Sequence, residues 1–480
     1  MKACAVVIGI GDGSMSRSLV SGYRDVVTIV LPGEQPLPQM PGHQFVVGAL
    51  EDAAEVVSKR FARHEEIVKL PDTDFYDQHP CSADPAFRHA FCTTFYQQLG
   101  ERPLWMGDSV TDCLQGAYHM ALHAHLLAGA PRPDEIASLD CPVLCIASGP
   151  SVQTHLDHIR SLARKCLIIV ADSALEPLLA AGIQPDIVTP LERVPEITHE
   201  SFPAPHYQGI FAGTPAVHHD IAPKFDRHIL IPGSDLLFSW FGCDPKHQFF
   251  YGQSTGVLAC SLALKLSTGK VYLIGHDLCY AGEESHWRAC NPAVKTHADS
   301  ESVPVPGNDG QTKLARHWWN IFRRELGDLA HVSGRVVNVN AHAKIGALIH
   351  HALAEPLPDP SILDDKQELS LPAVNQERVT QMLEKLERLP KDAQRMLAKL
   401  SGCNLTLADL NIAELCPGPN RDLMAYLLRS VMASVSMDHW TSRPAKQAAE
   451  FGAQAMRNVI RANMGVFRVM ANSREAACVA

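Results

Sequence analysis

The sequence predicts an α/β protein with a central domain built on a parallel sheet, a smaller α/β domain before it and a helical domain after it. Short apolar runs predict the central fold, because they end in small or polar residues that lead into helical patterns, as at residues 143–151 and 167–175. A third apolar run, at residues 271–274, also ends in polar residues. The 480 residues are enough for two or three domains with full cores.

The first domain is predicted at residues 1–100. An apolar run from Ala5 to Ile10 precedes a glycine-rich turn at residues 11–14, a helical pattern and a second run from Val26 to Leu31. This order resembles a degenerate Rossmann opening, whose glycines could cradle a nucleotide. Leu31-Pro32 replaces the acidic residue expected at the end of the second strand. We therefore expect a remnant α/β scaffold rather than a cofactor site.

The central domain is predicted at residues 101–354, and its first strand-to-helix junction is Ser148-Gly149-Pro150-Ser151. Gly149 lets the backbone approach a ligand closely. Ser151 can cap the following helix, whose free N–H groups attract phosphate. Such turns occur in any α/β protein, so this one alone is weak evidence for a nucleotide site.

Two further junctions carry polar side chains. Asp172 and Ser173 follow the second apolar run, and Glu192-Arg193 follows Ile187 and Val188. Ligands of open parallel sheets bind outside the carboxyl ends of the strands, so these coincident polar ends indicate a nucleotide-binding crevice. Each residue also has an ordinary structural role open to it: Asp172 as a helix cap, and Glu192-Arg193 as a surface ion pair.

A second candidate anion site lies at Ser254, Thr255 and Gly256. These residues place two hydroxyls and a bare backbone at the N-terminus of an apolar helix, where Leu258 and Leu262 recur at helical spacing. All three are candidate nucleotide-binding residues.

The strand predicted at Val271–Ile274 ends in Gly275-His276-Asp277, with Tyr280 and His286 close behind. We expect the carboxyl, phenol and imidazole groups to lie together. His286 is the candidate general base, because an unperturbed imidazole has a pKa of about 6.5, near working pH. Tyr280 and His286 could equally be a packing residue and an ordinary histidine.

Four motifs between residues 149 and 193, GPS, ADSAL, GIQPD and LER, resemble those of the motility-associated factor (Maf) glycosyltransferases. That family shares its central domain with archaeal hydroxymethylpterin diphosphokinases. The resemblance continues at residues 252–280, 305–310 and 337–349. The Glu192-Arg193 pair favours the Maf branch, whose members also carry an N-terminal Rossmann-like domain.

Residues 252–280 also resemble the nucleotide-binding half of bacterial sialyltransferases. The resemblances imply a glycosyltransferase that moves a nonulosonic acid of the pseudaminic, legionaminic or sialic acid kind from a CMP donor to Ser or Thr hydroxyls of flagellin. In that reaction Tyr280 would donate to the leaving phosphate and Asp277 would orient the acceptor or ribose. A helix N-terminus and hydroxyls can replace a divalent cation, so we expect no cofactor and no metal.

Composition restricts the class of protein further. A net charge of −10 without a basic stripe argues against nucleic acid as a partner. The 14 scattered cysteines, several within apolar runs, indicate reduced thiols. The short apolar start is unlike a signal peptide, and no long apolar stretch could insert into a membrane, so we expect a cytoplasmic protein.

Two pairs of adjacent histidines, His218-His219 with Asp220 and His350-His351, resemble metal ligands. Adjacent residues point apart on a helix or a strand, so we expect neither pair to form a metal site. The segment at residues 303–310 is predicted to be a loop, either a lid at the acceptor side or an ordinary connection.

A proline-rich linker at residues 355–360 leads into a helical domain predicted at residues 361–480, which could pack, form a homo-oligomer or recognise a protein acceptor. Two other functions stay open. A pterin diphosphokinase would need Mg²⁺ and ATP, with Asp172, Glu192 and Asp277 as candidate ligands. A nucleotide-binding flagellar accessory protein would need no catalysis.

Overall fold

The computed structural model describes part of the chain: residues 2–8, 14–19, 23–30, 43–47, 73–77, 110–233, 235–244, 246, 249–292, 295–298, 302–401, 415–416, 418–428, 430 and 445–472. The chain forms two compact units. Unit 1 comprises Met1–Leu114, Ala393–Pro417 and Met424–Asn463, and unit 2 comprises Gln115–Asp392, Gly418–Leu423 and Met464–Ala480. The three consecutive domains expected from the sequence stay a prediction.

Unit 1 contains a four-stranded parallel sheet in the order β3-β2-β1-β4. Its elements are β1 (Lys2–Ile8), α1 (Ser14–Leu19), β2 (Tyr23–Val30), β3 (His43–Val47) and β4 (Thr73–Asp77). The strand, helix and strand expected at the start of the chain are therefore present. Residues 11–13 of the expected glycine-rich turn lie outside the described residues, and Ser14 is the first residue of α1.

Unit 2 is built on a seven-stranded sheet in which every neighbouring pair is parallel, in the order β13-β10-β5-β6-β7-β8-β9. The predicted α/β fold is confirmed. The strands are β5 (Val143–Ile146), β6 (Leu167–Ala171), β7 (Ile187–Thr189), β8 (Ile210–Gly213), β9 (Arg227–Leu230), β10 (Val271–Ile274) and β13 (Val336–Asn338).

The strand order reverses at β5. From β5 the chain moves outward through β6, β7, β8 and β9, and it then returns to the other side of β5 to form β10 and β13. The strands β6 and β10 therefore lie on opposite sides of β5. Such a reversal opens the crevice in which parallel α/β sheets bind ligands.

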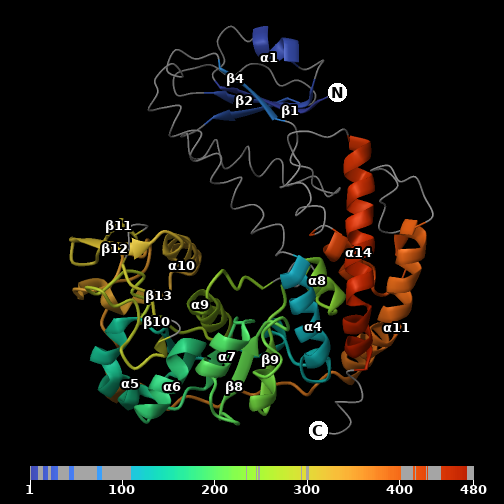
Figure 1. Cartoon of the computed structure of the whole chain (residues 1–480). Coiled ribbons are helices and arrows are strands. Elements are labelled where there is room, and N and C mark those ends of the chain that lie inside the picture. The colour runs from blue at the N-terminus through green and yellow to red at the C-terminus, as the bar shows by residue number, and fades with distance from the viewer. Residues whose placement is uncertain are drawn as a thin grey trace. The chain divides into compact units, whose positions relative to one another are not determined.

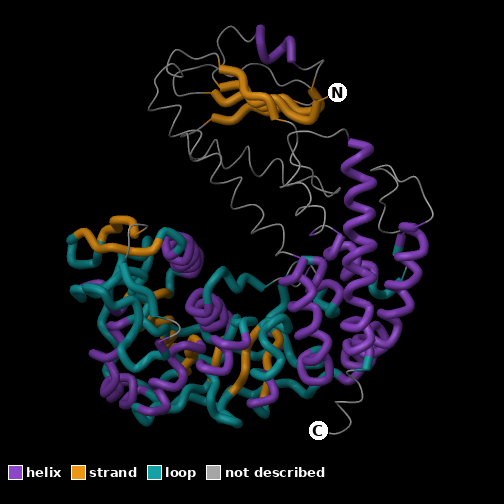
Figure 2. Tube along the Cα trace, in the orientation of Figure 1, coloured by secondary structure: helices purple, strands orange, loops and turns teal. Residues whose placement is uncertain are grey.

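Helices cover both faces of this sheet (Figures 1 and 2). One face carries η3 (Pro150–His155), α5 (Leu156–Leu162), α6 (Asp172–Ala180) and α7 (Pro195–Ser201), and the other carries α9 (Thr255–Leu266) and α10 (Trp319–Ser333). Among the described residues, further helices are α4 (Val110–Leu127), α8 (Leu236–Trp240), α11 (Gln376–Ser401), α14 (Ala445–Ala471) and the short turns η2 (Pro133–Glu135), η4 (Ala222–Lys224), η7 (Val339–His342) and η8 (Pro360–Ile362). The predicted helical C-terminal region is thus present in α11 and α14.

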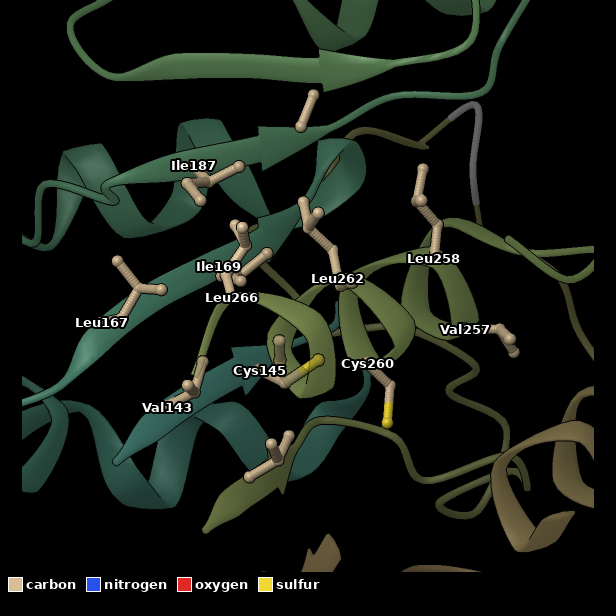
Figure 3. Close-up of a cluster of buried hydrophobic side chains, with 14 of the residues drawn as sticks. Val143, Cys145, Leu167, Ile169, Ile187, Val257, Leu258, Cys260, Leu262 and Leu266 are labelled. Atoms are coloured by element: carbon tan, nitrogen blue, oxygen red, sulfur yellow. The ribbon is translucent and has the colours of Figure 1, made fainter. Parts of the chain in front are cut away.

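The core beneath α9 explains why this helix is apolar all round. Figure 3 shows Leu258, Leu262 and Leu266 of α9 in one buried cluster with Val143 of β5 and Ile169 of β6. All five are buried, and complete burial of such a side chain contributes about 1.5–3 kcal/mol. Because α9 is fixed in this way, its N-terminus is held at the carboxyl edge of the strands.

The segment expected to be a loop at residues 303–310 is instead largely a β-hairpin, so that expectation is wrong. β11 (Ser302–Pro306) pairs antiparallel with β12 (Thr312–Arg316) through a turn at Gly307–Gly310. Pro304 and Pro306 are two residues apart and share one side of β11. In an antiparallel ladder alternate N–H groups point away from the partner, so proline is tolerated there.

The proline-rich segment after residue 354 is packed: the Pro358 carbonyl oxygen lies 2.9 Å from Nε2 of His158, and Leu357 is buried. Lys366 pairs with Asp186 and donates to the Cys166 carbonyl oxygen at 2.9 Å. Leu369 is buried in the core of the sheet. The segment therefore packs within unit 2.

Cys145, Cys166 and Cys260 are buried free thiols, as their apolar surroundings predict. Among the described helices, none is both long and apolar enough to cross a membrane.

Candidate functional site

The loops that leave β5 and β10 are in direct contact. The Gly149 N–H donates to the Gly275 carbonyl oxygen at 2.9 Å. A Cβ on Gly149 would lie 2.4 Å from an oxygen of Asp277, and one on Gly275 would lie 2.3 Å from the Ala147 carbonyl oxygen. Gly275 also has a φ of 72°. Glycine is therefore required at both positions for the two strand ends to meet.

Asp277 is the centre of this junction. One carboxylate oxygen accepts the Ser151 N–H at 2.8 Å, and the other accepts the side-chain amide of Asn340 at 2.7 Å. Burial raises the pKa of Asp277 to about 6, although the hydrogen bonds from Ser151 oppose that shift. With both oxygens engaged and 1% of the residue exposed, Asp277 positions the loops rather than contacting an acceptor.

Ser151 does not have the expected capping role. Gly149 is the N-cap of the 3-10 turn η3, and no side chain caps that turn. The Ser151 N–H is engaged by Asp277, and its hydroxyl oxygen accepts from Asn340 at 2.9 Å. The expectation that this helix start presents free N–H groups to a phosphate is therefore wrong for Ser151, while Pro150 has no N–H to offer.

The predicted residues on the β6 side do come together. The Ser173 hydroxyl donates to the Ser148 hydroxyl at 2.8 Å, and the Ser173 N–H donates to Asp172 at 2.7 Å. Thr255, at the start of α9, also donates to Asp172. Ala171 is the N-cap of α6, so Asp172 is not the helix cap. Ser148, Asp172, Ser173 and Thr255 form one polar cluster, which we call the serine–aspartate cluster.

The Asp172 carboxyl has an unusual environment. Burial, and to a smaller extent the nearby negative charge of Glu192, raise its pKa to about 6 against the hydrogen bonds from Ser173 and Thr255. One Glu192 oxygen accepts the N–H groups of Arg193 and Val194 at 2.8 and 2.7 Å, which closes the turn into α7. The carboxylate of Glu192 therefore lies close to that of Asp172 in the serine–aspartate cluster.

The start of α9 is as expected. The Ser254 hydroxyl caps the helix by accepting the Val257 N–H at 3.2 Å. The carbonyl oxygen of Gly256 is 3.2 Å from Nε2 of His276, and burial lowers the pKa of His276 to about 4. His276 thereby ties the end of β10 to the start of α9.

His286 lies over the β5 loop. Its Nδ1 is 2.8 Å from the Ser285 hydroxyl, and the next residue, Trp287, donates its N–H to the Ser148 carbonyl oxygen at 2.7 Å. Burial, and then the charge of Lys295, lower the pKa of His286 to about 4. In the tautomer with its hydrogen on Nδ1, the Nε2 lone pair is available as a base.

Tyr280 does not fit its predicted role. Its hydroxyl donates to the His297 carbonyl oxygen at 3.0 Å and accepts from Arg316 at 3.0 Å. Its ring packs against Trp319, with the ring centroids 5.0 Å apart. The residue is 4% exposed. Because its hydrogen is already donated, Tyr280 positions Arg316 and residues 296–297 rather than a leaving phosphate.

Sequence reasoning missed Asn340, Ser285 and Arg316. Asn340 follows the strand β13 by two residues, so the rule that polar residues after parallel strands gather at one edge could have found it. Ser285 and Arg316 are placed by the packing of loops, which no local pattern reveals. Ser285 accepts the Thr296 N–H at 2.8 Å and so connects His286 to the segment that Tyr280 holds.

The expectation that His218 and His219 point apart is wrong. Their ring centroids are 4.5 Å apart, because they lie in a turn after β8 rather than in a helix or strand. The rings of His350 and His351 are 6.3 Å apart, and among the described residues they belong to no group of three possible metal ligands.

Comparison with known proteins agrees with this architecture. Residues 120–283 match the family model of 6-hydroxymethylpterin diphosphokinase MptE-like proteins, and no curated protein matches the chain in sequence. The solved structure of the Maf glycosyltransferase from Magnetospirillum magneticum AMB-1 is similar to the chain, with a TM-score of 0.60 and 17% sequence identity. That similarity covers 98% of this chain and 78% of the other.

The chain has the Maf glycosyltransferase fold. Its MptE-like region begins in α4 and ends after β10, so it contains the serine–aspartate cluster and Asp277. The predicted resemblance to the Maf glycosyltransferases, with an MptE-like central region, is confirmed.

Proposed function

We propose that this protein is a glycosyltransferase that moves a nonulosonic acid from a CMP donor to Ser or Thr hydroxyls of flagellin. The observation that carries the proposal is the placement of the serine–aspartate cluster and His286 around Ser148, at the strand reversal of a Maf glycosyltransferase fold. Flagellin as the acceptor comes from the family resemblance alone, and a cytoplasmic location is the expectation from composition.

In this proposal the donor lies against the serine–aspartate cluster. Asp172 and the hydroxyls of Ser148 and Ser173 are suited to a ribose, and the first N–H groups of α9 are suited to the phosphate. The bond between sugar and phosphate breaks through an oxocarbenium-like state, and CMP leaves with both electrons of that bond. The helix N-terminus stabilises the charge that develops on the phosphate.

In this proposal His286 acts on the acceptor hydroxyl. As the acceptor hydroxyl oxygen bonds to the sugar, its proton moves to Nε2 of His286, which is neutral at pH 7 because its pKa is lowered to about 4. Ser285, hydrogen-bonded to Nδ1, orients the ring. Asp277 and Tyr280 act indirectly by fixing the loops around the site.

One observation favours a second function, an MptE-like diphosphokinase. Asp172 and Glu192 are close enough for the charge of one to raise the pKa of the other, and such a carboxylate pair is suited to Mg²⁺. Asp277, the third expected ligand, has both oxygens engaged by protein donors. In a diphosphokinase, binding of Mg²⁺ would therefore depend on Asp172 and Glu192.

Calorimetric titration of the full chain with CMP, and separately with Mg·ATP, distinguishes the two functions. The transferase predicts CMP binding that persists in the presence of a chelator, and weaker binding in Thr255→Tyr. His286→Ala should retain CMP binding and lose transfer to flagellin. Binding of Mg·ATP without CMP would contradict the transferase. Normal transfer by His286→Ala would exclude the proposed base, and silence with both nucleotides would favour an accessory protein.

A further inference from the structure

Five polar side chains from three segments of unit 2 gather beside the turn at residues 192–193. They are His119 of α4, His199 of α7, and His218, His219 and Asp220 of the turn after β8. One ring nitrogen from each of His119, His218 and His219 lies within 4.8 Å of the other two. We call these three residues the histidine triad.

The hydrogen bonds within this group conflict with one another. Nδ1 of His219 faces Nδ1 of His119 at 3.0 Å, and Nε2 of His219 faces Asp220 at 3.6 Å. The His219 backbone N–H donates to Nδ1 of His119 at 3.4 Å, so that nitrogen is an acceptor and Nδ1 of His219 must carry its hydrogen. A neutral imidazole has one N–H, so Nε2 of His219 then sets a lone pair against the Asp220 carboxylate. His119 is 3% exposed, and its Nε2 is buried without a hydrogen-bond partner. Ordinary core histidines satisfy such groups.

A metal ion removes that conflict. Zn²⁺ held tetrahedrally at about 2.0–2.1 Å from nitrogen separates two ligand atoms by roughly 3.3 Å. The 3.0 Å between the Nδ1 atoms of His119 and His219 is close to that separation. With Nδ1 of His219 on the ion, its Nε2–H can point to Asp220, which also lies 3.8 Å from Nδ1 of His218. A carboxylate behind metal-bound imidazoles is the usual outer arrangement.

The surroundings keep the triad ready to bind a cation. His119 and His218 are buried and His219 is partly buried, with one ring nitrogen of each within 4.8 Å of the other two. Arg193 lies close enough for its positive charge to act on His119, while Asp220 places a negative charge beside His218 and His219. His123 contacts the carbonyl oxygens of Pro215 and His219 at 3.3 and 3.1 Å, so it holds the turn in place and is not a ligand.

We propose that the histidine triad binds one divalent transition-metal ion of the Zn²⁺ type, with the Asp220 carboxylate orienting the imidazole of His219. Imidazole nitrogen suits this class of ion rather than Mg²⁺ or Ca²⁺. The ion joins α4 to the turn after β8, and the His218 N–H donates to the Glu192 carbonyl oxygen at 2.9 Å. The ion therefore fixes the turn that carries Glu192 and Arg193. It does not act on the sugar donor, and the site stands whether or not the proposed transferase activity does.

The test is direct binding of Zn²⁺ and Co²⁺ to the full chain after treatment with a chelator. Calorimetry should give one Zn²⁺ per chain, and Co²⁺ should produce visible absorption bands of a nitrogen and oxygen site. His219 is 31% exposed at its side chain, so His219→Ala should fold and bind no Co²⁺. Asp220→Asn should weaken binding about 10–100-fold.

A matched control is available in unit 2. His331 and His351 also lie close together, with ring centroids 4.4 Å apart, and both are exposed. The double variant His331→Gln/His351→Gln should bind Zn²⁺ and Co²⁺ like the original chain. Circular dichroism identifies any variant that fails to fold, and His119→Gln then serves as a second test. Absence of Zn²⁺ binding, or unchanged binding in folded His219→Ala, would overturn the site.

Discussion

Asn340 donates a hydrogen bond of 2.7 Å to Asp277 across 63 residues of sequence, and it reaches Ser151 with the same amide nitrogen at 2.9 Å. These contacts join the residues that follow β5, β10 and β13, three adjacent strands of the sheet. The Asp277 carboxylate at the centre of these contacts is buried, so these hydrogen-bond donors offset the cost of removing it from water.

Asn340→Ala should therefore destabilise unit 2. The substitution leaves a buried carboxylate without one of its donors, at a cost of about 1.5–3 kcal/mol in the free energy of unfolding. Urea denaturation followed by circular dichroism measures that loss. Asn458→Ala, at an exposed position of α14, should change the free energy of unfolding by less than about 0.5 kcal/mol. Equal effects of the two substitutions would show that Asn340 does not support Asp277.

Gly149→Ala tests the contact between the loops of β5 and β10. The added methyl group would lie 2.4 Å from both an Asp277 oxygen and the Gly275 carbonyl oxygen, so the loops must separate. We expect a loss of about 1–3 kcal/mol, the usual cost of an overpacked site, together with weaker CMP binding.

The control for that experiment is Gly465→Ala. No atom lies within 4 Å of a Cβ added there, and the residue is inside helix α14, where alanine should stabilise by about 0.5–1 kcal/mol. Thermal unfolding of both variants should therefore shift in opposite directions. A shift to higher temperature in Gly149→Ala would mean that the loops do not meet as described.

Asp172 gives a prediction about pH. Its pKa is raised to about 6 in the folded protein, so the folded state holds this proton more tightly than the unfolded state. The resulting stability is present below pH of about 4, the ordinary aspartate range, and is lost as pH rises through about 6. Asp172→Asn removes this loss, so the variant should gain stability over the original chain between pH 5 and 8, while its CMP binding weakens.

Urea denaturation at both pH values measures that difference. Asp134→Asn, at an exposed position of η2, should differ from the original chain equally at the two pH values. If Asp172→Asn behaves like this control, the Asp172 carboxyl is not held in the buried, repulsive environment described here.

His286 predicts the acid limb of the transfer reaction. Because burial lowers its pKa to about 4, transfer should stay constant from neutral pH down to about pH 5 and decline near pH 4. His286→Ala should reduce transfer by about 10²–10⁴-fold with little change in CMP binding. Rates at saturating donor across this pH range provide the measurement, and His331→Ala is the exposed control. An acid limb near pH 6.5 would assign the base to another residue.

Local sequence patterns predicted the elements of the central sheet and several of its polar strand ends. The apolar runs before Ser148 and Asp172 are strands, and Ser254 caps α9 as its hydroxyl and the following apolar helix indicate. These features depend on hydrogen bonds and side-chain periodicity within a few residues, so the sequence alone determined them.

The roles of individual side chains depended on which strands became neighbours. Because β10 pairs with β5, Asp277 is buried against Ser151 instead of facing a substrate. The packing of β12 brings Arg316 close enough to donate a hydrogen bond to the Tyr280 hydroxyl. The contact of His119 with His219, 100 residues away, arises in the same manner. Hydrogen bonding and desolvation depend on atoms brought together from distant segments, so only the tertiary structure decided these roles.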